Sequence, residues 1–254
     1  SGTDLSTVLG LSSITAAVLT QGVASVTLTA ETKLSGITAI KAAINIKGAM
    51  FIDNILDADV PDLATFAGAN AMLIYEVFSG SSYLVKSSSN PVWAVKLSSQ
   101  SNFRCLFSAA GNRKLAATYM ARNHTVLFTG QNTAITMNLK ALAVKAEEYT
   151  ETVIASAYTV GLDLLTIIKN LPVVLTSPAN DFVDNIYNLL AFIDNVQTNS
   201  FNLLKVTPTK VPQTNPGISL IEDDCEKTCR QFVRAGVFAP GTWTLTDFFG
   251  DREQ

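Results

Sequence analysis

The chain contains one histidine, His124, and this count limits the acid–base and metal chemistry that the sequence offers. A hydrolase with a serine or cysteine nucleophile activated by histidine, or a zinc site with several histidines, would have to use this one position. The chain also lacks a phosphate-binding glycine loop, a G-x-S-x-G elbow, a dinucleotide-binding glycine pattern and a C-x-x-C pair. The sequence therefore predicts no catalytic residues, no cofactor, no metal site and a protein that is not an enzyme.

The tripeptide Asn123-His124-Thr125 matches the acceptor pattern for N-glycosylation. The pattern is short and occurs often by chance, so a plain turn before a strand explains it equally well. Asn123 is thus a candidate glycan acceptor if the protein is secreted and an ordinary turn residue otherwise.

Two acidic clusters favour structural roles. The cluster of Asp53, Asp57, Asp59 and Asp62 resembles half of a calcium loop, but the glycine and the closing glutamate of an EF-hand are missing. The second cluster, at residues 222–226, opens a predicted helix, where negative charge complements the helix dipole. We interpret the first cluster as a solvated, helix-capping loop and the second as a charged helix start.

The three cysteines, Cys105, Cys225 and Cys229, leave one thiol over if a disulfide forms. Cys225 and Cys229 are four apart in a predicted helix, near the upper limit of the Cα separation that a disulfide spans. A bond from Cys105 to one of them is at least as plausible, and three reduced thiols are the other alternative.

The composition favours an assembled protein. Hydrophobic residues make up 48% of the 254 residues and charged residues only 15%, against about 25% charged in ordinary globular domains. A surface with so few charges is commonly covered by a partner, a lipid or a glycan. The net charge of −3 makes nucleic acid an unlikely partner. These features favour an extracellular or virion location.

The C-terminal sequence contains a candidate interface. Pro208, Pro212 and Pro216 recur every fourth residue, a spacing that favours stiff, extended backbone of about 3.1 Å per residue. Beyond a short predicted helix at 222–236, the chain ends with four large apolar side chains: Trp243, Leu245, Phe248 and Phe249. We expect a proline-rich arm with a terminal helix and an aromatic tail that grips either its own subunit or a neighbour.

The elements before this arm predict an α+β fold. A charge-free amphipathic stretch predicts an N-terminal helix at 5–20, followed by a strand at 26–29, and 36–48 fits a helix or a strand equally. Alternation of apolar and polar residues predicts a central antiparallel sheet over about 72–140. Its expected strands are 72–78, 82–87, 92–99, 102–108, 125–130 and 133–140, with short helices at 62–69 and 113–122.

Helical spacing of apolar residues predicts a long C-terminal helical hairpin over about 141–205, with helices at 142–171 and 178–204. The predicted division is a body of 1–205 and an arm of 206–254.

The sequence thus favours a non-enzymatic, self-associating structural protein, such as a capsid or coat protein or another extracellular assembly subunit, which forms a homo-oligomer. The alternative is a secreted carrier of apolar ligands or a membrane-active protein, so a lipid or membrane partner stays open. In composition, the N-terminal stretch is similar to the membrane-entering helices of some pore-forming proteins.

Overall fold

The computed structural model describes residues 31–177 and 181–239, and, as backbone alone, four further strands. Two of these, β1 (Ser13–Ala16) and β2 (Val26–Thr29), pair antiparallel near the N-terminus. The other two, β8 (Thr244–Asp247) and β9 (Gly250–Glu253), form an antiparallel pair near the C-terminus. The strand predicted at 26–29 is confirmed as β2. The helix predicted over 5–20 is wrong at residues 13–16, where the structure has β1, and its other residues lie outside the described part of the chain.

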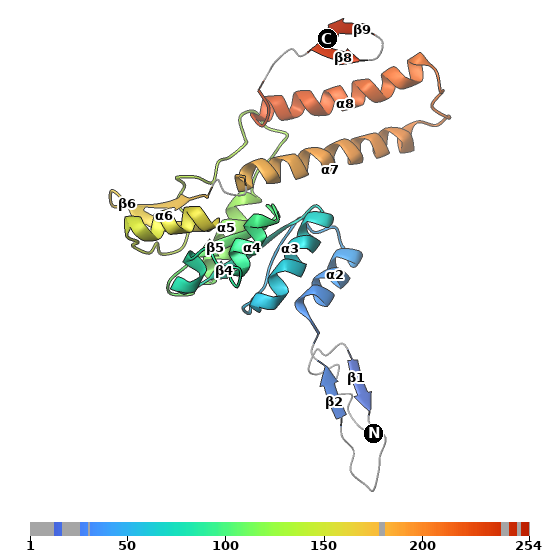
Figure 1. Cartoon of the computed structure of the whole chain (residues 1–254). Helices are drawn as coiled ribbons and strands as arrows, with labels where there is room; N and C mark the ends of the chain where they lie inside the picture. Colours follow the sequence, from blue (N-terminus) through green and yellow to red (C-terminus); the bar gives the residue numbers. More distant parts are fainter. Residues whose placement is uncertain are drawn as a thin grey trace.

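The body is built on a five-stranded sheet with the order β3-β4-β5-β6-β7 (Figure 1). Its strands are β3 (Gly48–Met50), β4 (Leu73–Phe78), β5 (Phe103–Phe107), β6 (Asp163–Ile168) and β7 (Leu171–Leu175). The first four are parallel and β7 runs antiparallel to β6. Every residue of β4 and β5 is buried, which is typical of parallel strands covered on both faces.

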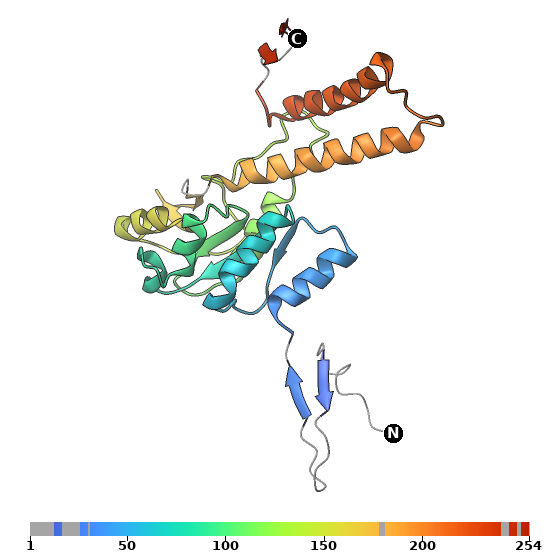
Figure 2. The same ribbon diagram turned by 45° about the vertical axis from the view of Figure 1, so that its right-hand side comes forward.

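Helices cover both faces of this sheet (Figures 1 and 2). One face packs against α2 (Lys33–Ala43), α3 (Val60–Ala69), α4 (Pro91–Leu97) and α6 (Glu151–Val160). The other face packs against α5 (Lys114–Asn123), the first turns of α7 (Val183–Val206) and the segment 135–146. Alternate residues of β4 point into the two cores, because successive side chains of a strand face opposite sides.

The mixed α+β class is therefore confirmed, but the predicted antiparallel arrangement of the central sheet is wrong. The expected strands at 72–78 and 102–108 are β4 and β5, which are parallel neighbours. The expected strand at 82–87 contains the short 3-10 helix η2 (Ser81–Leu84). The expected strand at 92–99 is α4, because the Asn90 side chain accepts from the Val92 N–H and Pro91 occupies the first turn. The segments expected as strands at 125–130 and 133–140 form loops.

The helices predicted at 62–69 and 113–122 are confirmed as α3 and α5. In the ambiguous segment 36–48, the structure has the greater part of α2, followed by β3.

The helix predicted at 142–171 is also wrong over most of its length. Only α6 is helical; the Thr150 side chain caps its start, and Gly161, with a φ of 102°, ends it. Lys169 and Asn170 have positive φ angles of 50° and 65°, as a two-residue hairpin turn between β6 and β7 requires. Apolar residues three or four apart therefore belong here to a short helix and to a hairpin whose strands are buried at one end.

The C-terminal pair of helices is present, but it consists of α7 and α8 (Asn215–Ala235). These helices lie side by side and antiparallel, extending beyond the body (Figures 1 and 2). Helix α8 begins seven residues before the predicted start at residue 222, since Pro216 fits the first helical turn, where a proline costs no hydrogen bond. The predicted extended arm is therefore reduced to a connection at 207–214. Within the described residues, no helix combines the length and the apolar character that crossing a membrane requires.

Candidate interaction surface

The described part of the predicted interface is the connection between α7 and α8. Pro208 and Pro212 lie in this connection and Pro216 lies in the first turn of α8, so the prolines shape a helix–helix turn. Gly217 is buried against it, and a Cβ at this position would lie 1.9 Å from the Pro212 carbonyl oxygen. The turn therefore depends on a glycine at 217. Of the predicted anchors, Leu245 lies in β8, and Trp243, Phe248 and Phe249 lie outside the described residues.

Aromatic rings attach the helix pair to the body. Phe232 of α8 is fully buried and stacks on Phe128 with ring centroids 4.9 Å apart. It also contacts Phe192 of α7 at 5.2 Å and Phe238 at 6.1 Å. Phe128 belongs to the loop that follows α5, so these contacts join α7 and α8 to the sheet layer. We call these four phenylalanines the anchor cluster.

Tyr187 of α7 joins the anchor cluster to His124, because its ring lies 5.9 Å from Phe128 and 4.5 Å from His124. The Nε2 of His124 is 3.1 Å from the Tyr75 hydroxyl. Burial lowers the pKa of His124 to about 4, so the imidazole is neutral at pH 7. In this setting His124 packs and hydrogen-bonds between α7 and β4.

Asn123 is buried beside His124 and donates from Nδ2 to the Tyr75 hydroxyl at 2.9 Å. A glycan on Nδ2 would have to replace this hydrogen bond and push the side chain out of the core. The role of Asn123 as a glycan acceptor stays a prediction, and it requires this side chain to leave the core.

The predicted disulfides do not form in the structure either. Cys105, Cys225 and Cys229 are all free thiols. Cys105 is buried in β5, in the core shared with α3 and α4, whereas the other two lie on α8, which packs against α7. The fold thus places Cys105 and α8 in different layers. Burial of Cys105 raises its pKa, so the thiol stays protonated and unreactive.

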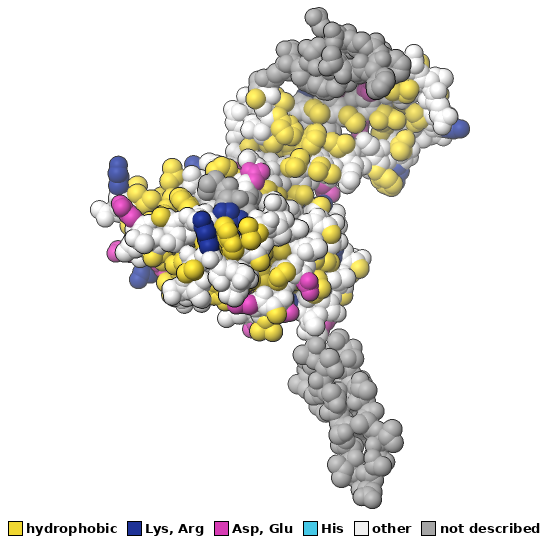
Figure 3. All heavy atoms as spheres, in the orientation of Figure 1, with side chains coloured by type: hydrophobic (Ala, Val, Ile, Leu, Met, Phe, Trp, Pro, Cys, Tyr) yellow, Lys and Arg dark blue, Asp and Glu magenta, His cyan; other side chains and the backbone are white. Residues whose placement is uncertain are grey.

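Large apolar side chains are exposed on both helices of the pair. At about 100° per residue, Leu189, Ile193 and Leu204 of α7 fall within about 60° of one another. Their exposed fractions are 52%, 41% and 56%, and Ile218 and Ile221 of α8 are 53% and 40% exposed. Hydrophobic side chains gather over both helices on the face seen in Figure 3. We call these five residues the apolar face.

The polar groups of the sheet are largely engaged within the chain. Arg104 and Asp163 form a buried ion pair between β5 and β6, with Nη2 and Oδ2 2.8 Å apart. Arg113 donates from both terminal nitrogens to the Glu76 carboxylate, at 2.7 and 2.9 Å, and also donates to the Phe51 carbonyl. These contacts tie strands and loops together and leave neither carboxylate as a free base.

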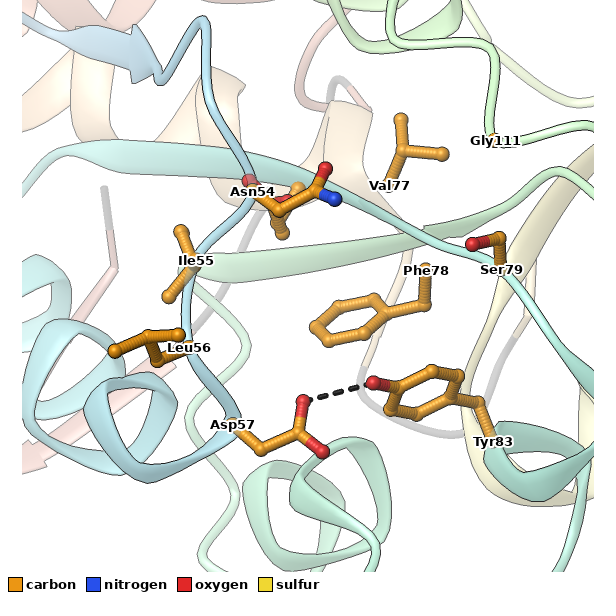
Figure 4. Close-up of a pocket in the computed structure, with 10 residues that line it drawn as sticks. Asn54, Ile55, Leu56, Asp57, Val77, Phe78, Ser79, Tyr83 and Gly111 are labelled. Carbon is orange, nitrogen blue, oxygen red and sulfur yellow. Dashed lines mark hydrogen bonds between the residues drawn. The ribbon is translucent and has the colours of Figure 1, made fainter.

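A cavity of about 440 Å³ lies at the carboxyl end of β4, lined in part by Asn54, Phe78 and Tyr83 (Figure 4). The Tyr83 hydroxyl points across it and donates to Asp57 at 2.8 Å. Burial and the Asp57 carboxylate raise the pKa of Tyr83 to about 12, so the phenol stays protonated. Asp57, which the sequence assigns to a helix-capping loop, therefore links this loop to Tyr83 of η2.

The loop after β5 donates hydrogen bonds to the Glu147 carboxylate of the same chain. Glu147 accepts from the Ser108 hydroxyl, from the Ala110 N–H at 3.2 Å and from the Tyr149 hydroxyl at 2.9 Å. Open parallel sheets commonly bind ligands at this carboxyl edge. Here Glu147 takes up the donors that an anionic ligand would use. Among the described residues, no group of three or more His, Cys, Asp or Glu side chains is arranged to hold a metal ion.

Comparison with known proteins identifies one similar family. Residues 183–252 match the family model described as "E217 tail sheath protein gp31-like, C-terminal domain". The match starts at the first residue of α7 and includes α8 and β8. No curated protein matches the chain. Over this segment the chain is similar to a viral structural protein, which indicates a self-assembling, virion-associated protein and points to a non-enzymatic role.

Sequence reasoning missed the apolar face because it assigned this stripe of α7 to a helix partner at 142–171. The signal was present, since Leu189, Ile193 and Leu204 continue the stripe that begins at Val183 and Ile186. Only the structure shows which side chains of α7 stay exposed.

Proposed function

We propose that the chain is a structural subunit of a viral tail sheath or a related coat, and that it assembles with copies of itself through its C-terminal region. The observation that carries this proposal is the match of residues 183–252 to a tail sheath C-terminal domain. The matched segment contains the helix pair whose apolar face is exposed.

The composition and the internal pairing of polar groups support a structural subunit. A protein with 15% charged residues and an exposed apolar face gains solubility when neighbours cover that face. The acidic side chains at the carboxyl edge of the sheet, Glu76 and Glu147, hold loops in place. The helix pair extends from the body and so offers a surface to neighbours (Figure 2).

The C-terminal segment is the proposed grip on a neighbour. Residues 240–254 contain the anchors Trp243, Leu245, Phe248 and Phe249, which bury large apolar areas when they dock. We propose that these side chains cross to an adjacent subunit. The division into a body of 1–205 and an arm of 206–254 stays a prediction, and the family match groups α7 with the segment that follows it.

Light scattering and negative-stain electron microscopy of the purified chain test this function. We expect ordered assemblies larger than a dimer, and deletion of residues 240–254 should reduce their size. A chain that is monomeric at every concentration and salt condition, before and after the deletion, would contradict the proposal.

The alternative of an apolar-ligand carrier has less support. The cavity between α7 and the loop at Phe128, lined in part by Tyr187 and Leu190, measures about 160 Å³. Small-molecule sites usually measure about 300–1,000 Å³.

A further inference from the structure

The hairpin of β6 and β7 forms one end of the five-stranded sheet, on the opposite side of the body from α2 (Figure 1). We propose that residues 138–147, which we call the strap, are a built-in cover of this hairpin that keeps its strand edges from pairing with other copies of the chain. This role goes beyond the proposed function, because it concerns a contact that an assembling subunit has to avoid.

The strap is hydrogen-bonded to the outer edge of β7. The Val174 N–H donates to the Lys140 carbonyl at 2.8 Å, and the Val174 carbonyl accepts from the Leu139 N–H at 2.8 Å. The Thr176 N–H donates to the Asn138 Oδ1 at 3.4 Å. The strap therefore takes the place that a strand from another chain would occupy at this edge.

Pro172 protects the next outward position of β7. Residues 172 and 174 both direct their backbone groups away from β6, because inward and outward groups alternate along a strand of an antiparallel pair. A proline at this position has no N–H to offer to another strand, which is why prolines in sheets are confined to such edges. The strap and Pro172 together leave no free backbone N–H at residues 172, 174 and 176.

The strap also reaches the other side of the hairpin. The Glu147 N–H donates to the Leu165 carbonyl at 3.3 Å, and Glu147 forms a parallel bridge with Thr166 of β6. Between its two ends, the strap packs Val144 and Ala146 on the core that contains Leu165. One continuous segment thus crosses a face of the hairpin and pairs with both of its strands.

Backbone strain in the strap supports a specific role. Leu139 has a φ of 60°, in the left-handed region that a leucine side chain disfavours. Its side chain is 61% exposed, so burial does not compensate for the strain. Strain of this kind persists where the surrounding contacts impose it, and here the Leu139 N–H is held by the Val174 carbonyl.

An open edge on this hairpin would be hazardous. Residues 164–168 have the sequence LLTII, without a charge, a proline or a glycine. Short segments of this type pair with copies of themselves when a strand edge is exposed. In an assembly, where copies of the chain are concentrated, such pairing would compete with the ordered contacts. The strap therefore restricts assembly to surfaces outside the hairpin.

One experiment opens the edge. Leu139→Pro removes the N–H that the Val174 carbonyl accepts from and forbids the positive φ, and Pro172→Val restores a donor to the edge. In this double variant, hydrogen exchange of the Val174 amide should be about tenfold faster than in the wild type or more. The variant should also form aggregates that bind thioflavin T at concentrations at which the wild type binds none.

Circular dichroism checks that the double variant folds. If it does not, Asn138→Ala with Pro172→Val provides the same test, because it removes only the acceptor of the Thr176 N–H from the strap. The matched control is Leu139→Gly, which keeps the N–H and relieves the positive φ. It should protect Val174 at least as well as the wild type does and should form no dye-binding aggregates. Pro172→Val alone leaves the strap in place and should also behave as the wild type does.

The results that would overturn the role of the strap are specific. If the folded double variants neither exchange faster at Val174 nor bind the dye, the strap does not protect the hairpin. If Pro172→Val alone aggregates as fully as the double variants, the proline protects the edge without the strap. The proposed function is tested separately: a wild type that does not self-associate contradicts that function, whereas exchange and dye binding still test the strap.

Discussion

At the scale of single residues, the buried ion pair of Arg104 and Asp163 links the middle of the sheet to the start of α7. Asp163 also accepts from the Tyr119 hydroxyl at 2.7 Å and from the Ser177 N–H at 2.6 Å. Arg104 donates to the Asp181 carbonyl at 2.9 Å, just before α7. Both charges are satisfied only while all of these elements are in place.

Arg104→Met should therefore leave Asp163 as a buried charge without a countercharge. We expect the free energy of unfolding in urea to fall by about 3–5 kcal/mol. The matched control is Arg230→Ala, which breaks the exposed pair with Glu226 and should cost less than about 1 kcal/mol. Equal effects of the two variants would contradict the role assigned to burial.

The lowered pKa of His124 predicts that the stability of the fold depends on pH. Its pKa in the folded chain is about 4, below the usual 6.5, because burial between Tyr75 and Tyr187 disfavours the charged ring. The unfolded chain therefore binds a proton first as pH falls. The stability linked to His124 is complete above about pH 6.5 and is lost as pH falls toward 4.

His124→Phe keeps an aromatic ring in contact with Tyr187 and removes the titrating group. We expect urea titrations between pH 7 and 4 to show a shallower loss of stability for this variant than for the wild type. Parallel curves for the two proteins would show that His124 does not contribute.

At the scale of elements, the turn between α7 and α8 depends on one glycine. A Cβ at residue 217 would lie 1.9 Å from the Pro212 carbonyl oxygen, and backbone at this position cannot move without opening the turn. We expect Gly217→Ala to lower the melting temperature and to increase hydrogen exchange in the last turns of α7 and the first turns of α8.

The control is Gly36→Ala in α2, where the new Cβ would meet only the Glu31 side chain at 3.6 Å. This substitution should leave the free energy of unfolding unchanged or raise it by about 0.5–1 kcal/mol, because alanine favours a helix interior. A destabilisation as large as that of Gly217→Ala would contradict the close-approach argument.

Local signals in the sequence predicted several elements well. Helix α5 and strands β4 and β5 lie within one residue of their predicted bounds, whereas α7 begins at Val183, five residues after the predicted start at 178. The pair Asn90-Pro91 lies between two of the expected strands, at 82–87 and 92–99, but it caps and starts α4. Short apolar runs fit both periods, so the fold decides between helix and strand.

At the scale of the whole molecule, the anchor cluster makes the helix pair part of the body. Phe232 is buried among Phe128, Phe192 and Phe238, so Phe232→Ala should cost about 3–5 kcal/mol. We expect hydrogen exchange in the variant to show α8 opening at lower denaturant than β4 and β5. In the wild type, α8 should lose protection at a denaturant concentration closer to that of β4 and β5.

The outcome that would contradict this view is equal protection of α8 in the wild type and the variant. Such a result would mean that the helix pair is held to the body by other contacts, such as the ion pair between Lys47 and Asp194 at 2.6 Å.

The sequence by itself determined the mixed class, a pair of C-terminal helices, and the expectation of a charge-poor structural protein that assembles. These follow from composition and from periods within single segments. Strand direction and order were decided only by the tertiary structure, because β4 and β5 pair across the intervening α4, and alternation does not encode which strands become neighbours. The same holds for the exposed apolar side chains of α7: their spacing is visible in the sequence, but whether they are covered depends on how α7 lies against the body and α8.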